Sequence, residues 1–304
     1  MDRVELEPVP PYSLSRTVGA FSRFPNELVD RVERDTYRRA FASGDGVVLL
    51  EASQPEDTDP NGPVTVMAHS VSGSPDVAAA IQCLSHTLAI SEAIEPVYRA
   101  GSSNSAVTYL TRRLRGLRRT LDPTPFEGLV SSILAQLISI RAASVIRSRF
   151  VQRFGRSIEH EHDVYWVFPE PERVAGTSID ELCGLGMTRA KARAILGVAE
   201  LAANGRLVHD RLAQLGDSEV MATLTALPGI GPWTAEWFLV NVLGRMAIVP
   251  AGDLGIRRAT GRWLLDGSMP SPDEVRAVYE PYGDRRGYVA YYVLSAERYR
   301  LDPP

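Results

Sequence analysis

A hairpin bracketed by two glycines limits what this chain can fold into more than any other feature. Gly229 and Gly231 flank Ile230, and an apolar segment of helical length lies on each side. The sequence therefore predicts a helix that ends near Leu227 and a second helix that starts near Trp233. Glycines leave backbone amides unobstructed, and the positive end of the following helix attracts anions, so the pattern is typical of a grip on a nucleic-acid phosphate. A plain corner between two helices is the alternative.

A single carboxylate follows the second helix. Asp253 comes after Pro250 and Gly252 and before Leu254 and Gly255, where a third helix should begin. An acid at this distance from a phosphate-binding hairpin is placed to do chemistry on a nucleic acid. A helix N-cap is the alternative role, because aspartate is among the residues preferred there.

The N-terminal part of the chain predicts a small antiparallel sheet backed by one helix. Residues 1–10 contain prolines and should be extended, and a polar loop is expected at residues 54–62. A helical stripe of apolar residues runs from about residue 76 to residue 91. The expected strands span residues 36–42, 47–52 and 64–71.

Beyond residue 105 strand signals nearly vanish, and segments with helical periodicity take over. This organisation predicts an α+β protein, with a sheet-and-helix domain at residues 1–110 and an almost all-α domain at residues 111–304. The expected helices span residues 106–116, 125–138, 141–154, 171–175, 178–184, 188–204, 208–214, 217–225, 232–243, 254–264, 271–279 and 285–298.

The charge of the chain is unevenly distributed. Its net charge of −4 argues weakly against a nucleic-acid partner when taken alone. Residues 111–156, however, carry ten basic and only two acidic side chains. This arginine band fits either a phosphate footprint or a solvated helix face. Its members are Arg112, Arg113, Arg115, Arg118, Arg119, Arg141, Arg147, Arg149, Arg153 and Arg156.

Composition argues against several other classes of protein. The two cysteines, Cys83 and Cys183, supply neither a disulfide framework nor the thiolates of an iron–sulfur cluster. The His-Glu-His-Asp run at residues 160–163 lacks a second set of ligands, so we expect a surface loop there and no metal site. No apolar run approaches the roughly 20 residues that span a bilayer, and the N-terminus does not resemble a secretion signal. We therefore expect a cytoplasmic protein without membrane contact.

The hairpin and its surroundings resemble the helix-hairpin-helix DNA glycosylase superfamily, and within it the 3-methyladenine DNA glycosylase II group. The resemblance rests on residues 227–257 and is supported by residues 125–140, 168–194 and 286–288. It implies a helical domain of two lobes with a cleft between them, preceded by the small domain that this group carries. It also implies a base excision repair enzyme that flips a damaged base out of double-stranded DNA and hydrolyses its N-glycosidic bond.

The resemblance assigns roles to single residues. Asp253 would be the catalytic carboxylate, which stabilises the oxocarbenium-like sugar and directs water. Trp233 and Trp237 would form the aromatic wall that stacks on an electron-poor base. The backbone anchors on DNA would be Gly229, Ile230, Gly231 and Thr234.

The same transfer suggests a wedge and shows one departure from the group. Leu137, beside Gln136 in the expected helix, would fill the gap left by the flipped base. The group often has a pocket tryptophan where this chain has Leu294, with Tyr291 just before it. These two residues would line the substrate pocket in its place, which leaves the range of substrates open.

The position of lysine decides the expected chemistry. Bifunctional relatives place a Schiff-base lysine where this chain has Trp233, and the only lysine of the chain is Lys191. We therefore expect hydrolysis of alkylated purines such as 3-methyladenine, without strand cleavage. A glycosylase for deaminated or oxidised bases and a non-catalytic protein that binds damaged DNA are the alternatives. We expect a nucleoid-associated monomer that requires no cofactor; a monovalent cation held by hairpin carbonyls stays open.

Overall fold

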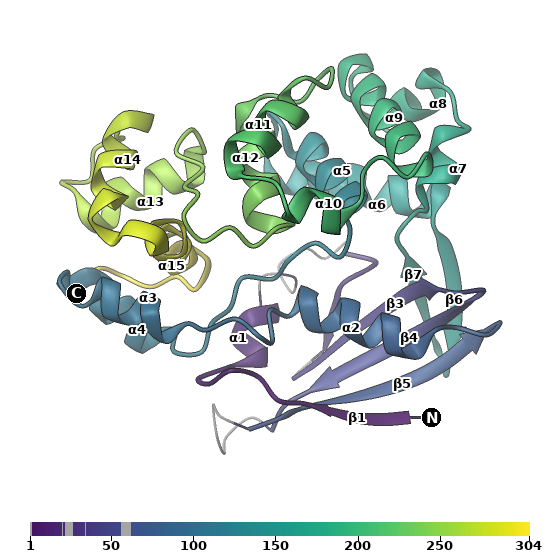
Figure 1. Ribbon diagram of the computed structural model, residues 1–304, viewed down its shortest axis with the longest axis horizontal. Helices are drawn as coiled ribbons and strands as arrows, with labels where there is room; N and C mark the ends of the chain where they lie inside the picture. The colour runs from purple at the N-terminus through teal and green to yellow at the C-terminus, as the bar shows by residue number, and fades with distance from the viewer. Residues whose placement is uncertain (1, 20, 22–26, 34, 56–61) are drawn as a thin grey trace.

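The computed structural model describes residues 2–19, 21, 27–33, 35–55 and 62–304. In this part of the chain an N-terminal antiparallel sheet lies against a larger helical region (Figure 1). The strand order is β1-β5-β4-β3-β2, and α2 (Val77–Thr87) packs on the sheet, so the predicted meander and its backing helix are confirmed. The polar loop predicted at residues 54–62 lies mostly outside the described residues. The strands are β1 (Asp2–Leu6), β2 (Arg31–Glu33), β3 (Thr36–Ser43), β4 (Gly46–Ser53) and β5 (Val64–Ser72).

Three strand pairings were missed at the sequence level, among them that of the short β2 with β3. β1 pairs with β5 along its whole length, with Val4 opposite Val66. The expectation of almost no strands after residue 105 is wrong for β6 (Arg156–His160) and β7 (Asp163–Val167), which form a hairpin. The apolar side chains of this hairpin pack on β3 and β4 of the N-terminal sheet, a partner that no local pattern can reveal.

The helices predicted beyond residue 105 are present, with bounds shifted by a few residues at most. Serine, threonine, asparagine or aspartate side chains cap many of their N-termini, which explains why the starts were readable. The described chain holds no helix long and apolar enough to cross a membrane. The predicted helices are α4 (Ser105–Arg113), α5 (Pro125–Ala135), α6 (Ile140–Phe154), α7 (Pro171–Ala175), α8 (Ile179–Gly184), α9 (Arg189–Ala203), α10 (His209–Ala213), α11 (Asp217–Thr225), α12 (Pro232–Asn241), α13 (Leu254–Leu264), α14 (Pro272–Tyr279) and α15 (Arg286–Arg298). Outside that prediction are α1 (Leu14–Val18), α3 (Glu95–Gly101) and the 3-10 helix η2 (Glu280–Arg285).

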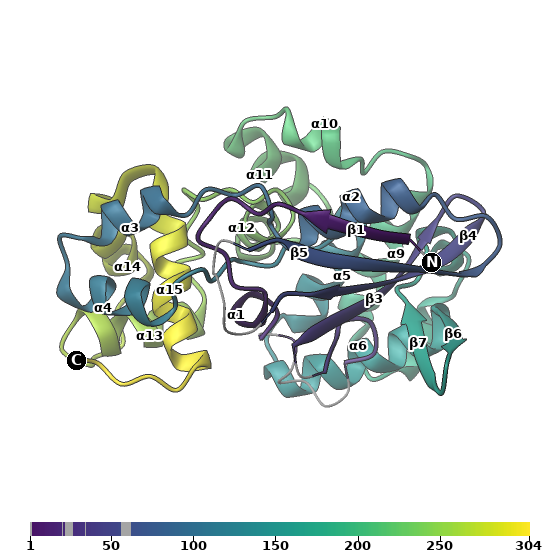
Figure 2. The same ribbon diagram turned by 90° about the horizontal axis from the view of Figure 1, so that it is seen from below.

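The helices form two lobes with separate cores. One core joins α5 to α12, and the other joins α3 and α4 with α13 to α15. Figure 2 shows the second group together at the opposite end of the molecule from the sheet. The domain boundary near residue 110 stays a prediction. In the structure α4, which contains this position, and α3 before it pack on the C-terminal helix α15. Because α12 belongs to the first lobe and α13 to the second, the segment between them lies at the junction of the lobes.

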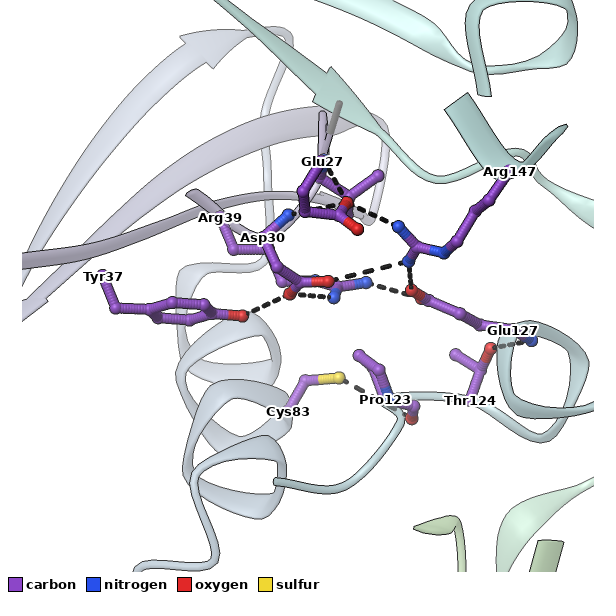
Figure 3. A network of polar contacts seen from close by, with 10 residues as sticks. Glu27, Asp30, Tyr37, Arg39, Cys83, Pro123, Thr124, Glu127 and Arg147 are labelled. Carbon is purple, nitrogen blue, oxygen red and sulfur yellow. Dashed lines mark hydrogen bonds and ion pairs between the residues drawn. The ribbon is translucent and has the colours of Figure 1, made fainter. Parts of the chain in front are cut away.

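A buried ion network fastens the sheet to the first lobe (Figure 3). Arg39 on β3 donates to Asp30 Oδ1 at 2.6 Å and to Glu127 Oε2 of α5 at 2.5 Å. Arg147 on α6 donates to Glu127 Oε1 at 2.8 Å and to Glu27 Oε1 at 2.5 Å. Burial disfavours the charge of Asp30, but the guanidinium groups of Arg39 and Arg147 outweigh it and hold the pKa of Asp30 below its usual value. The network therefore fixes α5 and α6 relative to the sheet.

The network corrects part of the arginine-band interpretation. Arg147 is a member of the network, and Arg118 and Arg119 are buried between the N-terminal segment and the second lobe. Arg118 donates to the carbonyls of Glu92 and Val9. A phosphate footprint is wrong for these three arginines, because their guanidinium groups bond inside the protein and not at its surface.

Candidate active site

The glycine hairpin lies exposed between α11 and α12. The Ile230 side chain is buried in the first lobe, which leaves the backbone of Gly229 and Gly231 at the surface. Gly229 has a φ of 81°, and a Cβ there would lie 2.7 Å from Ala194 Cβ, so only glycine fits this position. Gly231 is the N-cap of α12, whose first amides are thus available to an anion.

Asp253 lies at the start of α13 and receives three N–H donors. Its Oδ1 accepts from the amides of Gly255 at 2.8 Å and Ile256 at 3.0 Å, which makes it the N-cap of the helix. Its Oδ2 accepts from the indole Nε1 of Trp233 at 3.1 Å. Since Trp233 is the second residue of α12, this bond places the carboxylate beside the hairpin. The two roles weighed from the sequence are thus compatible, because an N-cap uses only one of the two oxygens.

The proposed pocket residues divide into two groups. The rings of Trp233 and Trp237 lie 6.4 Å apart with an interplanar angle of 70°, and both are partly buried. Leu294 on α15 approaches the start of α13, since a Cβ on Gly255 would lie 3.4 Å from it. Tyr291 is placed differently: it is buried and donates to the carbonyl of Arg118 at 3.2 Å. Trp233 therefore bonds to Asp253 directly, Trp237 lies beside Trp233, and Leu294 lies at the helix that Asp253 caps. The hydroxyl of Tyr291 bonds to Arg118 instead.

The proposed wedge lies in a loop rather than in a helix. The sequence predicted a helix to residue 138, but α5 ends at Ala135, and Leu137 has a φ of 56°. The Leu137 side chain is fully exposed. A large apolar side chain held out into solvent on a left-handed backbone is costly, so this position is a candidate for contact with a partner molecule.

Gln136 connects this loop to the hairpin. Its Nε2 donates to the carbonyl of Gly229 at 3.0 Å and to Thr234 Oγ1 at 2.9 Å. The amide of Gln136, expected to contact DNA, is therefore engaged within the protein, and direct DNA contact by it stays a prediction. The Gly229 carbonyl, one candidate ligand for a hairpin cation, already accepts this hydrogen bond.

Three exposed apolar residues escaped the sequence reasoning. Ile138 and Ile140 flank the loop of Leu137 and are 38% and 68% exposed, and Leu254, next to Asp253, is 61% exposed. A signal was available for Ile140 and Leu254, because each stands at a helix start, where burial by periodicity no longer holds; Ile138 lay inside a predicted helix and gave none. We therefore add them to the candidate surface around Leu137 and Asp253.

In the described part of the chain, no three histidine, cysteine or acidic side chains are grouped to hold a metal ion. The His-Glu-His-Asp run lies at the surface as predicted, where it closes the β6–β7 hairpin with Glu161 and His162 exposed in the turn.

Comparison with known proteins identifies the class. The family model described as HhH-GPD superfamily base excision DNA repair protein matches residues 130–282, half of the chain. The chain belongs to this superfamily, and the resemblance predicted from the sequence is confirmed.

Individual relatives point in the same direction. DNA-3-methyladenine glycosylase of Bacillus subtilis is 30% identical over 200 residues, which are 66% of each chain, just under two thirds. DNA-3-methyladenine glycosylase 2 of Escherichia coli is 28% identical over 298 residues, 96% of this chain and 97% of that one. The structure of 3-methyladenine DNA-glycosylase from Archaeoglobus fulgidus matches with a TM-score of 0.81 at 28% identity, over 98% of this chain and 99% of that one. These likenesses indicate a DNA glycosylase.

Proposed function

We propose that this protein is a monofunctional DNA glycosylase that releases alkylated purines such as 3-methyladenine from double-stranded DNA. The observation that carries the proposal is the Asp253 carboxylate, held by the indole of Trp233 directly behind the hairpin. The names of the relatives support the substrate class. Acting on a base requires that it leave the stack, and the exposed Leu137 can fill the gap.

The geometry of Asp253 supports a mechanism through water. As the N-glycosidic bond breaks, its electrons leave with the base, which removes the positive charge of an alkylated purine. The sugar becomes oxocarbenium-like, and the negative carboxylate stabilises it. Water then adds at C1′ and its proton passes to Asp253, whose oxygens keep free lone pairs besides the three bonds that they accept.

The same geometry disfavours strand cleavage. An amine must attack C1′ to form a Schiff base, and Trp233 occupies the position where relatives with that activity carry lysine. The only lysine, Lys191, is buried and donates from Nζ to the carbonyl of Leu134 at 2.8 Å. We therefore expect no covalent adduct with DNA after borohydride reduction.

A panel of duplexes tests the proposal. Each carries one lesion, either 3-methyladenine, 7-methylguanine, hypoxanthine or 8-oxoguanine, and the released base and any strand break are measured. We expect release of the methylated purines and no break without alkali. Preferred release of hypoxanthine or 8-oxoguanine contradicts the substrate class, and tight binding without release of any base shows a non-catalytic damage binder.

The wedge role of Leu137 gives a further prediction. Replacing Leu137 by Gly relieves a steric cost of about 1 kcal/mol on the left-handed backbone, and the flexibility of glycine offsets most of this gain. The free energy of unfolding should therefore change by less than about 1 kcal/mol. Base release from duplex DNA should fall about tenfold, because no side chain stabilises the opened stack, which costs a few kcal/mol to form. Urea denaturation and single-turnover kinetics measure the two quantities, and an unchanged rate of release contradicts the role.

A further inference from the structure

The only lysine of the chain stands in an unusual place. Lys191 lies in the first turn of α9, is 8% exposed, and directs its ammonium to the C-terminal end of α5. Its Nζ lies 2.8 Å from the carbonyl oxygen of Leu134, one residue before the end of that helix. Burial lowers the pKa of Lys191, since water no longer solvates its charge. An ordinary packing role does not require a cation here.

The end of α5 supplies what this cation needs. The last carbonyls of an α-helix have no partner within the helix, and the helix dipole gives this end a partial negative charge. An ammonium at that place satisfies a free carbonyl and meets the favourable end of the dipole. Lys191 thus fixes the point at which α5 stops and the loop of Leu137 begins.

A second contact fixes the same loop from the other side. Gln136, two residues after Leu134, is bonded through its side chain to Gly229 and Thr234 of the hairpin region. Leu137 follows immediately, with its strained φ and exposed side chain. Within four residues the chain therefore has two anchors, the carbonyl of Leu134 and the side chain of Gln136, and the projecting Leu137 follows directly after the second.

We propose that Lys191 is a positioning residue that holds Leu137 in the posture needed to enter the base stack. The proposal rests on the proposed function and deepens it, because it names what sets the wedge. Lys191 does not touch the reacting atoms in this assignment; it acts through the Leu134 carbonyl. Without the ammonium, the end of α5 can fray or extend, and Leu137 loses its fixed direction.

The choice of lysine over arginine fits this role. Of 33 basic residues, 32 are arginine, so the chain uses its only lysine at this buried helix end. An ammonium is a compact point charge, whereas a guanidinium is a larger, planar fork whose donors point in fixed directions. Arginine at this position should therefore fail to restore the geometry even though it keeps the charge.

Binding measurements separate this role from simple stabilisation. The dissociation constant is measured for a duplex with an abasic-site analogue and for the same duplex undamaged, in the wild type, Lys191→Met, Lys191→Arg and Arg206→Met. Arg206 is exposed just beyond the opposite end of α9, so its replacement controls for the loss of one positive charge. Thermal unfolding of each protein checks the fold, and Lys191→Arg, which keeps the charge and the long stem, serves if Lys191→Met does not fold.

We expect the wild type and Arg206→Met to prefer the abasic duplex. In both Lys191 variants this preference should fall about tenfold or more, since misplacement of a group by about 1 Å can have a large effect. Their affinity for undamaged DNA should stay within about twofold of the wild-type value. Base release from methylated duplex should fall in parallel. Retention of the full preference by Lys191→Met, equal losses on both duplexes, or a wild type without any preference overturns the proposal. If the wild type prefers the abasic duplex but releases no base, the proposed function is overturned. The positioning role of Lys191 is then still decided by the ratio of the two dissociation constants, for undamaged and abasic duplex, in the wild type and the Lys191 variants.

Discussion

Replacing Asp253 by Asn is expected to slow the release of methylated bases by at least about a hundredfold, the effect of removing one group aimed at transition-state charge. The substitution removes the negative charge and the proton acceptor, and it places Nδ2 opposite the donating indole of Trp233, so that hydrogen bond is lost as well. Asparagine caps helices about as well as aspartate, so its Oδ1 can still accept from the amides of Gly255 and Ile256. Single-turnover release from a methylated duplex measures the loss.

The matched control for this variant is Asp253→Ala. Both variants lose the bond to the Trp233 indole, but alanine also removes the cap of α13, so the free energy of unfolding of Asp253→Ala should be about 1 kcal/mol lower than that of Asp253→Asn. Affinity for an abasic duplex should persist in Asp253→Asn, because the hairpin and Leu137 are untouched. If Asp253→Asn releases methylated bases at the wild-type rate, Asp253 has no role in the chemistry and acts only as an N-cap.

Replacing Arg39 by Met is expected to lower the free energy of unfolding by about 3–5 kcal/mol, the cost of leaving buried charges without their partner. Arg39 is 3% exposed and bonds to Asp30 and Glu127, which would then face each other with Arg147 alone to balance them. Urea denaturation followed by circular dichroism gives the change in unfolding free energy.

The neighbouring residue provides the control. Arg38 lies next to Arg39 on β3 and pairs with Glu33 and Glu51, but its side chain is 23% exposed and these partners are more solvated. Arg38→Met should therefore cost no more than about 1 kcal/mol. If the free energy of unfolding falls equally in the two variants, the buried network stabilises the protein no more than the more exposed ion pairs of Arg38 do.

The sequence was most informative where local signals agree. Thr124, Ser139 and Asp253 each cap a helix, and Pro232 occupies the first turn of α12, so these helix starts could be predicted closely. The order of the hairpin and Asp253 also predicted that a carboxylate would lie near the start of a helix. Their meeting through Trp233 could not be derived, because it depends on how the two lobes pack.

The failures share a nonlocal cause. β6 and β7 are strands because their apolar face meets β3 and β4, more than a hundred positions earlier in the chain. Arg118 and Arg147 look like surface charges in a sequence, since only tertiary contacts show that their partners are buried. Leu137 fits a helical stripe, but the ties of Leu134 and Gln136 end the helix before it. Periodicity predicts which face is apolar and cannot predict where a neighbour interrupts the element.

The bonds of Gln136 have a consequence for the search along DNA. They connect the hairpin to the loop of Leu137. On the proposed function, whenever the hairpin binds the DNA backbone, Leu137 is therefore held against the nearest base pair. Inspection then needs no separate loop closure. The residence time at an undamaged site would then be set by the rate at which the hairpin dissociates from the phosphates. A damaged base pair would be distinguished because it opens more easily than an undamaged one when Leu137 contacts it.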